Sequence, residues 1–290
     1  MPALTFSKWS SGGNTTLFLH DVAAPPRRQA AWARAVLHPA VLGAEQAGCV
    51  SMAARTLHMA GGEFCVNASR AFGALLALSG PGAGAAPLCA DVSVSGWTGP
   101  VRLTVRGRAP RWEVSARLRL PPGCRPETHA GGRIVRLPGI THLLLPLGDG
   151  AAPPDLPERA RSAIRAAGLE DEAAAGIIWW KPRARGAAMF PVVRVRDAGT
   201  LVAENACGSG ALALALELAL QNGHGECDLL QPSGSVLHVR LAPPGEDGAL
   251  EAEIDGPVVL LARGRVWPDT ADTTDTADAA DAADTADAGN

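Results

Sequence analysis

Hydrophobic and polar residues alternate along much of this chain, and the alternation predicts more strands than helices. Residues 92–120 alternate and break at Gly and Pro, as an antiparallel β meander does. Further strands are predicted at 16–22, 141–147, 175–180, 190–195, 236–241 and 251–267. Amphipathic helices are predicted at 30–38 and 157–168, and a loop at 80–87. The pattern therefore indicates an α+β fold.

Two segments, EFCVNASRAFGALLALSG and ENACGSGALALALELALQNG, look like copies of one unit. In each, Glu precedes a Cys, small residues follow it, and an apolar helix runs to a glycine, Gly80 or Gly223. Cys65 and Cys207 are 142 residues apart, about half of the folded body. The repeat predicts two similar α+β halves, each with a cysteine at the start of its central helix. The alternative is a coincidence between two unrelated helix starts.

The composition is globular, with 47% hydrophobic and 19% charged residues in a chain of 290. Seven aspartates stand at every third position from Asp269 to Asp287, and residues 268–290 contain almost no large apolar side chain. Such a segment cannot bury enough surface to fold, so a disordered acidic tail is predicted. A calcium loop is disfavoured, because its glycines and bidentate Glu are missing.

Without the tail, the body has 22 acidic residues against 26 basic ones. This mild positive charge suits a small anion such as a carboxylate and is too weak to indicate nucleic-acid binding. The start of the chain lacks the basic and apolar regions of a signal peptide, and no apolar run is long enough to span a membrane. We therefore expect a cytoplasmic protein with no membrane partner and, at the start, six reduced cysteines.

The spacing of cysteines and histidines argues against a metal site. No C-x-x-C pair is present, which excludes a zinc ribbon or a thioredoxin-like motif. None of the seven histidines has the spacing of metal ligands. We expect no bound metal and no organic cofactor.

The start of a helix is a favourable place for a reactive thiol. Unpaired N–H groups and the positive end of the helix dipole stabilise a thiolate, so the pKa of the thiol is expected to fall. The same N–H groups bind carboxylates. Here they belong to Val66, Asn67, Gly208, Ser209 and Gly210.

Two such helix starts facing each other would form one site for an amino acid. Its carboxylate would bind the N–H groups and hold the α-carbon between the sulfurs of Cys65 and Cys207. One thiolate would remove the α-proton, and the opposite thiol would return a proton to the other face. The helix ends would stabilise the charge that develops. This is a two-base racemisation that needs no cofactor.

Five ordered motifs carry a resemblance to a known family: FSKWSSGGN, GAEQAG, GGEFCVNA, ENACGSGA and QPSGSV. Together they resemble the diaminopimelate epimerase superfamily, and most closely its histidine racemase branch, which makes D-histidine for staphylopine-type metallophores. The resemblance covers residues 4 to 265 and excludes the tail.

The resemblance implies roles for individual residues. Cys65 and Cys207 match the acid/base pair, and Asn14 and Asn67 match residues that line the pocket. Glu45 matches the acid that the histidine-specific branch places near the substrate. The residues also implied to face or bind the substrate are Glu204, Asn205, Val66, Gly208 and Ser209.

Two departures from the family pattern affect the choice of substrate. Val66 replaces the glycine after the first cysteine, and its side chain is expected to crowd the pocket. Diaminopimelate epimerases carry a longer E-R-G-x-G-E-T segment before the second cysteine, whose arginine helps to bind the distal end of the substrate. The segment LVAENACGSG has no such arginine. Diaminopimelate is therefore disfavoured, and histidine is the expected substrate.

The resemblance also implies a diaminopimelate epimerase-like fold, in which each pseudo-symmetric lobe is a curved, mainly antiparallel sheet wrapped around a central helix. We expect an N-terminal lobe at 1–128, a C-terminal lobe at 129–256, and a last strand at 257–266 that returns to the first lobe. The active site would lie in the cleft between the lobes.

Alternatives remain open for the activity. The chain could epimerise diaminopimelate or racemise another amino acid. A non-catalytic amino-acid-binding protein on the same scaffold is the alternative from a different class, although binding alone needs no thiols. A homodimer is also compatible with the sequence.

Overall fold

The alternating segments form strands, and the segments led by cysteine form helices, in the computed structural model of the chain. The structure describes residues 3–22, 24–80, 87–129, 131–148, 150–223 and 225–268. The helices in these ranges are α1 (Pro26–Leu37), α2 (Val66–Ser79), α3 (Leu156–Ala166) and α4 (Gly208–Asn222). The strands are β1 (Leu4–Ser11), β2 (Asn14–His20), β3 (Gln46–Ser51), β4 (Thr56–Met59), β5 (Leu88–Val94), β6 (Val101–Arg108), β7 (Arg111–Leu120), β8 (Glu127–His129), β9 (Gly132–Leu137), β10 (Ile140–Pro146), β11 (Ala174–Arg183), β12 (Gly186–Val195), β13 (Thr200–Ala203), β14 (Glu226–Leu230), β15 (Val236–Leu241) and β16 (Leu250–Val266). Over the described ranges, the protein has a mostly-β α+β fold with four helices.

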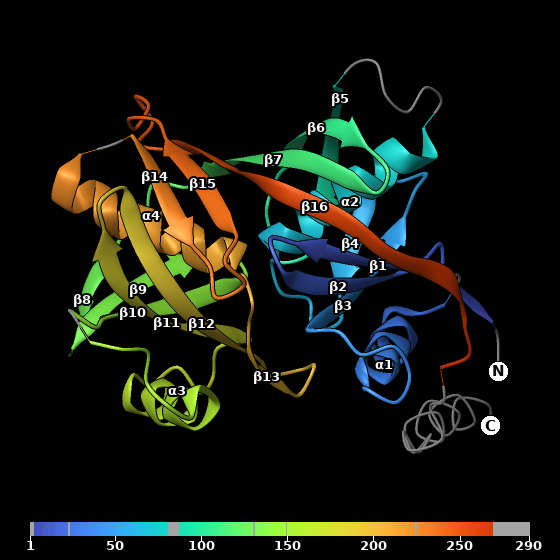
Figure 1. Cartoon of the computed structure of the whole chain (residues 1–290), viewed down its shortest axis with the longest axis horizontal. Coiled ribbons are helices and arrows are strands. Elements are labelled where there is room, and N and C mark those ends of the chain that lie inside the picture. The colour runs from blue at the N-terminus through green and yellow to red at the C-terminus, as the bar shows by residue number, and fades with distance from the viewer. Residues whose placement is uncertain are drawn as a thin grey trace, which may run out of the picture.

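Helix α2 lies inside a ring of strands in the N-terminal half (Figure 1). Strands β1 to β7 are neighbours in chain order, and β16 pairs with both β7 and β1, which closes the ring. The first ten residues of α2, 66–75, are all buried. A helix with strands around it needs apolar residues on every side, which is why α2 is not amphipathic.

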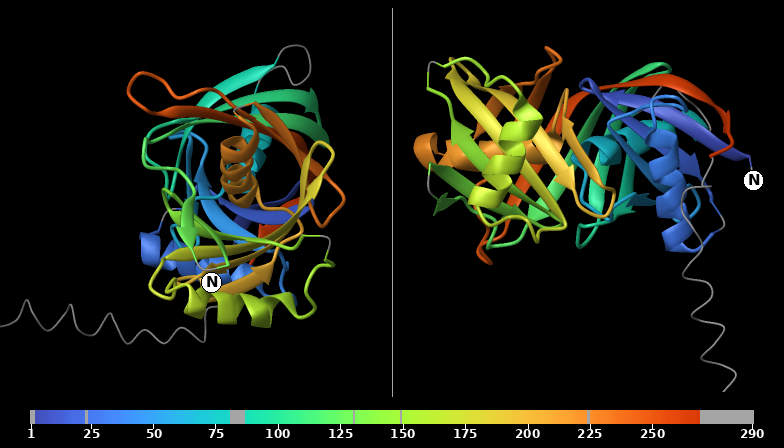
Figure 2. Two further views of the ribbon diagram at one scale, coloured as in Figure 1. Left: turned by 90° about the vertical axis from the view of Figure 1, so that its left-hand side faces the viewer. Right: turned by 90° about the horizontal axis from the view of Figure 1, so that it is seen from below.

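Helix α4 has the equivalent position in the C-terminal half, where β8 to β15 surround it (Figure 2, left view). Residues 208–218 of this helix are buried. Its single acidic residue, Glu217, is also buried and pairs with Arg133 at 3.1 Å. The apolar run of the sequence is therefore the core of this half.

Strand β16 connects the two halves. Its residues 252–255 pair with β15, residues 250–259 pair with β7, and residues 258–266 pair with β1, all antiparallel. One strand of 17 residues thus contributes backbone hydrogen bonds to both halves.

Helices α1 and α3 cover outer faces of the strands (Figure 1). Helix α1 buries Trp32 and Val36 in a cluster with side chains of β2 and β3. Helix α3 buries Ala160 and Ile164 in a cluster with side chains of β11 and β12. Each helix buries one face only, so both carry the amphipathic pattern that predicted them.

Every helix and strand predicted from the pattern is present. Helix α1 begins four residues earlier than predicted, at Pro26, a position where proline loses no helical hydrogen bond. The pattern missed seven strands: β1, β3, β4, β8, β9, β13 and β14. In β3, the residues QAGCVS are nearly all buried and so do not alternate. Residues 81–86 of the predicted loop, and the predicted acidic tail from residue 269 onward, lie outside the described residues.

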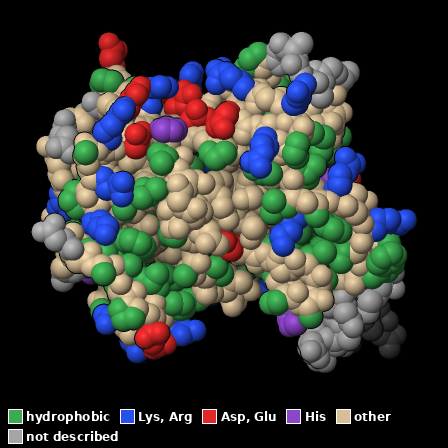
Figure 3. Space-filling view, viewed as in Figure 1, with side chains coloured by type: hydrophobic (Ala, Val, Ile, Leu, Met, Phe, Trp, Pro, Cys, Tyr) green, Lys and Arg blue, Asp and Glu red, His purple; other side chains and the backbone are tan. Residues whose placement is uncertain are grey.

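Charged side chains of both signs stand side by side along one edge of the surface, over β14, β15 and β16 (Figure 3). Arg240 pairs with Glu226 at 2.7 Å, and His238 pairs with Asp228 at 2.8 Å. The edge therefore has no single sign of charge. Within the described residues, no helix has both the length and the apolar character needed to cross a bilayer.

Candidate active site

Cys65 and Cys207 occupy the same position at the start of the two central helices. Each is the N-cap residue in an extended conformation, with φ and ψ of −130° and 109° at Cys65 and −134° and 105° at Cys207. The sulfur of Cys65 accepts the backbone N–H of Ala68 at 3.3 Å, and that of Cys207 accepts the N–H of Gly210 at 3.4 Å. The sequence prediction that both thiols cap a helix is confirmed.

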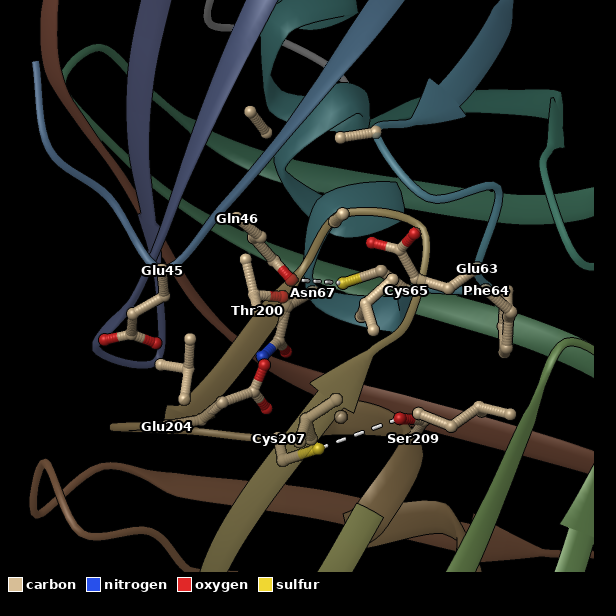
Figure 4. A pocket seen from close by; sticks show the side chains of 18 of the residues that line it. Glu45, Gln46, Glu63, Phe64, Cys65, Asn67, Thr200, Glu204, Cys207 and Ser209 are labelled. Atoms are coloured by element: carbon tan, nitrogen blue, oxygen red, sulfur yellow. Dashed lines mark hydrogen bonds between the residues drawn. The ribbon is translucent and has the colours of Figure 1, made fainter. Parts of the chain in front are cut away.

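The two helix starts meet at a cavity between the halves (Figure 4). Both cysteines line it, together with Glu45, Gln46 and Glu63 from the N-terminal half. The C-terminal half contributes Glu204, Gly208 and Ser209, and β12 and β13 add an apolar wall. The cavity is small, about 30 Å³. We therefore expect its walls to move apart when an amino acid enters.

Val66 lies at the contact between the helices rather than on the cavity wall. A Cβ on Gly208 would lie 2.8 Å from Cβ of Val66, so the valine fills the space that the glycine leaves. Next to it, Nδ2 of Asn67 donates to the carbonyl of Ala206 at 3.0 Å. The expectation that Val66 crowds the pocket is therefore wrong: its side chain packs against α4, and its backbone forms the first turn of α2.

Gln46 positions the thiol of Cys65, and the sequence analysis gave it no role. Its Nε2 donates to Oδ1 of Asn14 and to Oγ1 of Thr16, both at 2.7 Å. Both protons of the amide are used, so Oε1 points at Cys65 and accepts its S–H at 3.1 Å. A carbonyl acceptor at this place favours the thiol form of Cys65 over the thiolate.

Glu45 connects the two halves at the edge of the cavity. Nδ2 of Asn14 donates to one of its oxygens at 2.6 Å, and Nδ2 of Asn205, from the other half, donates to the second at 2.5 Å. Asn14 and Asn205 are absent from the cavity wall and act on Glu45, which lines it. Burial raises the pKa of Glu45, although these hydrogen bonds lower it.

A second polar chain reaches Cys207 through Ser209. The Oγ of Ser209 lies 3.7 Å from Sγ of Cys207 and 3.0 Å from Nε2 of His142 on β10. Burial lowers the pKa of His142 to about 3, so its imidazole is neutral. No local sequence motif marks His142.

Gly176 makes room for His142, because a Cβ at this position would collide with Nδ1 of the imidazole. Nδ1 is buried without a partner among the described residues. A buried lone pair without a partner costs less than a buried N–H without one, which favours the tautomer with its proton on Nε2, donated to Ser209.

Burial opposes the helix dipole at both sulfurs. It raises the pKa of the Cys65 thiol to about 12, and the charge of Glu204 acts in the same direction. Burial and Glu204 also raise the pKa of Cys207 well above its ordinary value. The expectation of a lowered thiol pKa is wrong, because removing the sulfurs from water raises the pKa by more than the helix N–H groups lower it.

Glu204 lies on the cavity wall near both thiols. Burial raises its pKa to about 8, and the neighbouring charges of Glu45 and Glu63 add to the shift. Glu63, which the sequence analysis mentioned only as part of a motif, is buried on the other side of Cys65 (Figure 4). Its Oε2 accepts the N–H of Gly61 at 3.0 Å, and burial raises its pKa.

The structure brings most of the predicted site residues to one cavity. The wall contains Cys65, Cys207, Glu45, Asn67, Glu204, Gly208 and Ser209. Asn14, Val66 and Asn205 lie behind it. Gln231 also stands behind the wall and accepts the N–H of Cys207 at 3.0 Å, which gives the QPSGSV motif a physical role. Within the described ranges, no three His, Cys, Asp or Glu side chains are grouped as metal ligands would be.

The fold is similar to solved structures of racemases and epimerases. A probable proline racemase from Agrobacterium radiobacter K84 matches with a TM-score of 0.64 and 14% identity, over 93% of this chain and 94% of that one. A hydroxyproline epimerase from Agrobacterium vitis matches with a TM-score of 0.62 and 12% identity, over 92% and 93%. These likenesses show the fold. Together with the histidine racemase relatives described next, they make the protein an isomerase of the racemase and epimerase type.

The chain belongs to the family described as the histidine racemase CntK N-terminal domain, whose model matches residues 3–267. A histidine racemase of Fusobacterium nucleatum subsp. nucleatum is 26% identical over 273 residues, which cover 91% of this chain and 96% of the relative. A histidine racemase from a second strain is equally similar. The resemblance inferred from the five motifs is confirmed.

Proposed function

We propose that this protein interconverts L- and D-histidine without a cofactor, with Cys65 and Cys207 as the acid–base pair. One observation carries the proposal: two thiols cap two helices in matching geometry and line one cavity. Membership of the histidine racemase family supports the substrate. The use of D-histidine in an opine-type metallophore rests on the resemblance to that branch alone.

The proposed binding mode follows from the charges around the thiols. The substrate carboxylate accepts N–H groups at the starts of α2 and α4, as anions do at helix N-termini. The α-ammonium pairs with Glu204, the acid near both sulfurs. This ion pair stabilises ionised Glu204 and cancels its charge, which had raised the pKa of both thiols. Substrate binding thus lowers the pKa of the thiols and favours the thiolate, which burial and the charge of Glu204 otherwise disfavour.

The proposed proton transfer uses one face of the α-carbon for each sulfur. For one enantiomer, the Cys207 thiolate, supported by the hydroxyl of Ser209, takes the α-proton and becomes a thiol. The electron pair left on the α-carbon delocalises into the carboxylate, where the helix ends stabilise it. Cys65, held as a thiol by Gln46, gives its proton to the opposite face and becomes the thiolate. The other enantiomer reacts in the reverse direction.

We also propose that the two halves are pseudo-symmetric lobes at 1–128 and 129–256, with residues 257–266 in the first lobe. The matching caps and the pairing of β16 with β1 support this division. Pseudo-symmetry would present the two thiols to opposite faces of one carbon. A homodimer stays a prediction.

The test is exchange of the α-proton of L-histidine for solvent deuterium, combined with chiral analysis of the product. We expect the wild type to racemise histidine, and Cys65→Ser and Cys207→Ser each to lose about a thousandfold or more of this activity, because a hydroxyl is a far weaker acid and base at neutral pH. Cys89→Ser is the control, since Cys89 is exposed and outside the cavity. Full activity in both cavity variants would exclude the two-thiol mechanism. Absence of exchange with histidine, diaminopimelate and a panel of other amino acids would exclude the racemase.

A further inference from the structure

The ionisable side chains that line the cavity are mainly acidic. Three of its lining residues are acidic, Glu45, Glu63 and Glu204, and none of the described residues that line it is Lys, Arg or His. A zwitterionic amino acid brings one cation, its α-ammonium, for which one carboxylate suffices. The other two acids therefore need their own explanation.

Glu45 is occupied within the protein. Each of its oxygens accepts an amide N–H, from Asn14 and Asn205, so this carboxylate ties the two halves together. Glu204, close to both sulfurs, is the acid placed for the α-ammonium. The proposed reaction assigns no role to Glu63.

Glu63 is held so that it can accept a further hydrogen bond. It is 7% exposed, and the Gly61 N–H that holds Oε2 is backbone, not an opposite charge. Within the described part of the chain, no Lys, Arg or His pairs with it. The carboxylate also accepts the backbone N–H of Glu63 itself. A carboxylate offers about four acceptor positions, so these two N–H groups leave some of them for a ligand in the cavity that Glu63 lines.

The surroundings of Glu63 are those of a side-chain pocket. Val195 and Ala198, from the opposite half, pack against the Gly61 turn that holds the carboxylate, and Phe64 and Ala60 line the same cavity. Figure 4 shows Glu63 beside Cys65, and Glu204 on the side of Cys207. Both acids line the same cavity, so a substrate whose ammonium binds Glu204 would place its side chain in the cavity that Glu63 also lines.

We propose that Glu63 determines specificity by binding an N–H or cationic nitrogen at the end of the substrate side chain. This inference rests on the proposed racemase function and defines the substrate class further: amino acids with a compact side chain that bears a donor nitrogen. The imidazole of histidine has both the flat apolar body and the donor. A substrate with a distal carboxylate would face a buried acid with no compensating cation, which is unfavourable.

Calorimetric titration measures the affinity for an amino acid directly, so it separates a role of Glu63 in binding from a role in catalysis. L-histidine, L-alanine and 3-thienyl-L-alanine are titrated into the wild type and Glu63→Gln. The thienyl ring has nearly the shape of imidazole but no N–H. Glutamine keeps an oxygen for the N–H of Gly61 while removing the charge. Glu251→Gln, an exposed acid on β16, is the matched control.

The wild type should bind L-histidine about 10- to 100-fold more tightly than thienylalanine, the range that one hydrogen bond to a charged group supplies. Glu63→Gln should weaken histidine binding by a similar factor and leave alanine binding within about twofold. The control should change neither value.

Equal affinity of the wild type for histidine and thienylalanine would overturn the assignment, and this comparison stands even if Glu63→Gln folds poorly. An equal loss for histidine and alanine in Glu63→Gln would assign Glu63 a structural role instead. Failure of the racemase proposal would give a different result, because no amino acid would then exchange its α-proton. The binding data would still show whether Glu63 binds a nitrogen of the side chain.

Discussion

At the scale of single residues, the chemistry of the site depends on which groups surround each sulfur. Gln46 offers Cys65 an acceptor, whereas Ser209 offers Cys207 a hydroxyl that His142 orients. The two thiols therefore have matching backbone geometry and different polar partners. Glu204 is electrostatically coupled to both, because its charge raises the pKa of each.

The pKa of Glu204, raised to about 8, predicts a pH dependence of activity. In the proposed binding mode, ionised Glu204 is the form that binds the α-ammonium, so kcat/KM for L-histidine should rise as pH increases through about 8. Glu204→Gln should lose this rise and lower kcat/KM by about 10- to 100-fold. The measurement is the pH profile of racemisation from pH 6 to 9.5. An unchanged profile in the variant would contradict the role of Glu204.

The same raised pKa predicts how stability changes with pH. Between about pH 4.5 and 8 the folded protein keeps a proton on Glu204 that the unfolded chain has lost, so the free energy of unfolding falls as pH rises through this window. Glu204→Gln should remove this contribution and be more stable at pH 8.5 by roughly 2 kcal/mol. Urea unfolding at pH 5, 7 and 8.5 measures it, with Glu251→Gln as the exposed control. A parallel decline in wild type and Glu204→Gln would count against it.

At the scale of elements, the site depends on how closely the starts of α2 and α4 approach. Gly208 has no side chain, and Val66 occupies the space in front of it. The family glycine after the first cysteine is replaced here by Val66, and the packing against Gly208 shows how α4 accommodates the larger residue. Close approach of two helix N-termini concentrates their N–H groups on one small anion.

Gly208→Ala tests this contact. The new Cβ would lie 2.8 Å from Cβ of Val66 and 2.9 Å from Oδ1 of Asn67, so the helices must shift apart. We expect a loss of about 1–3 kcal/mol in the free energy of unfolding and lower racemase activity. Adding Val66→Gly should restore part of both, because it removes the two Val66 atoms in conflict, Cβ and Cγ1. Gly123→Ala, where a Cβ meets nothing within 4 Å, should be neutral. No recovery in the double variant would show that the two residues are not coupled.

At the scale of the whole molecule, β16 joins the strands of the two halves into one sheet. We expect the halves to move relative to each other when substrate enters the cavity between them. Asn205 and Glu45, Asn67 and Ala206, and Ser233 and Gly12 form hydrogen bonds between the halves. These contacts hold the halves together at their junction, and we expect the small cavity beside them to widen when substrate enters. Strand β16 stays continuous on the side of the molecule where the halves are joined, which suits it to act as the hinge.

The shared strand predicts that the halves unfold together. Ile254 on β16 is fully buried, and it pairs with residues of both β15 and β7. Ile254→Ala should lower the free energy of unfolding by about 2–4 kcal/mol. Hydrogen exchange should accelerate in α2 and α4 alike. Leu261→Ala, on the same strand but 49% exposed, should cost about 1 kcal/mol or less. Faster exchange in one half alone would show that β16 does not couple them.

The sequence by itself determined the features that depend on neighbours in the chain. Strand alternation, the two apolar helices and their caps at Cys65 and Cys207 follow from local pattern, because each is set by residues a few positions apart. The five motifs were also sufficient to recognise the family. The short strand β3 escaped, because burial on both faces leaves no alternation to detect.

Only the tertiary structure decided what depends on residues distant in the chain. Gln46 reaches Cys65 across 19 residues, and His142 reaches Ser209 across 67. Neither pairing has a sequence signal, since contact depends on how the strands are arranged in the sheet. The raised pKa of each thiol likewise comes from its removal from water and from the charge of Glu204, which local helix geometry cannot report. The chain encodes two helix-capping cysteines locally, and the folded molecule brings them to one cavity.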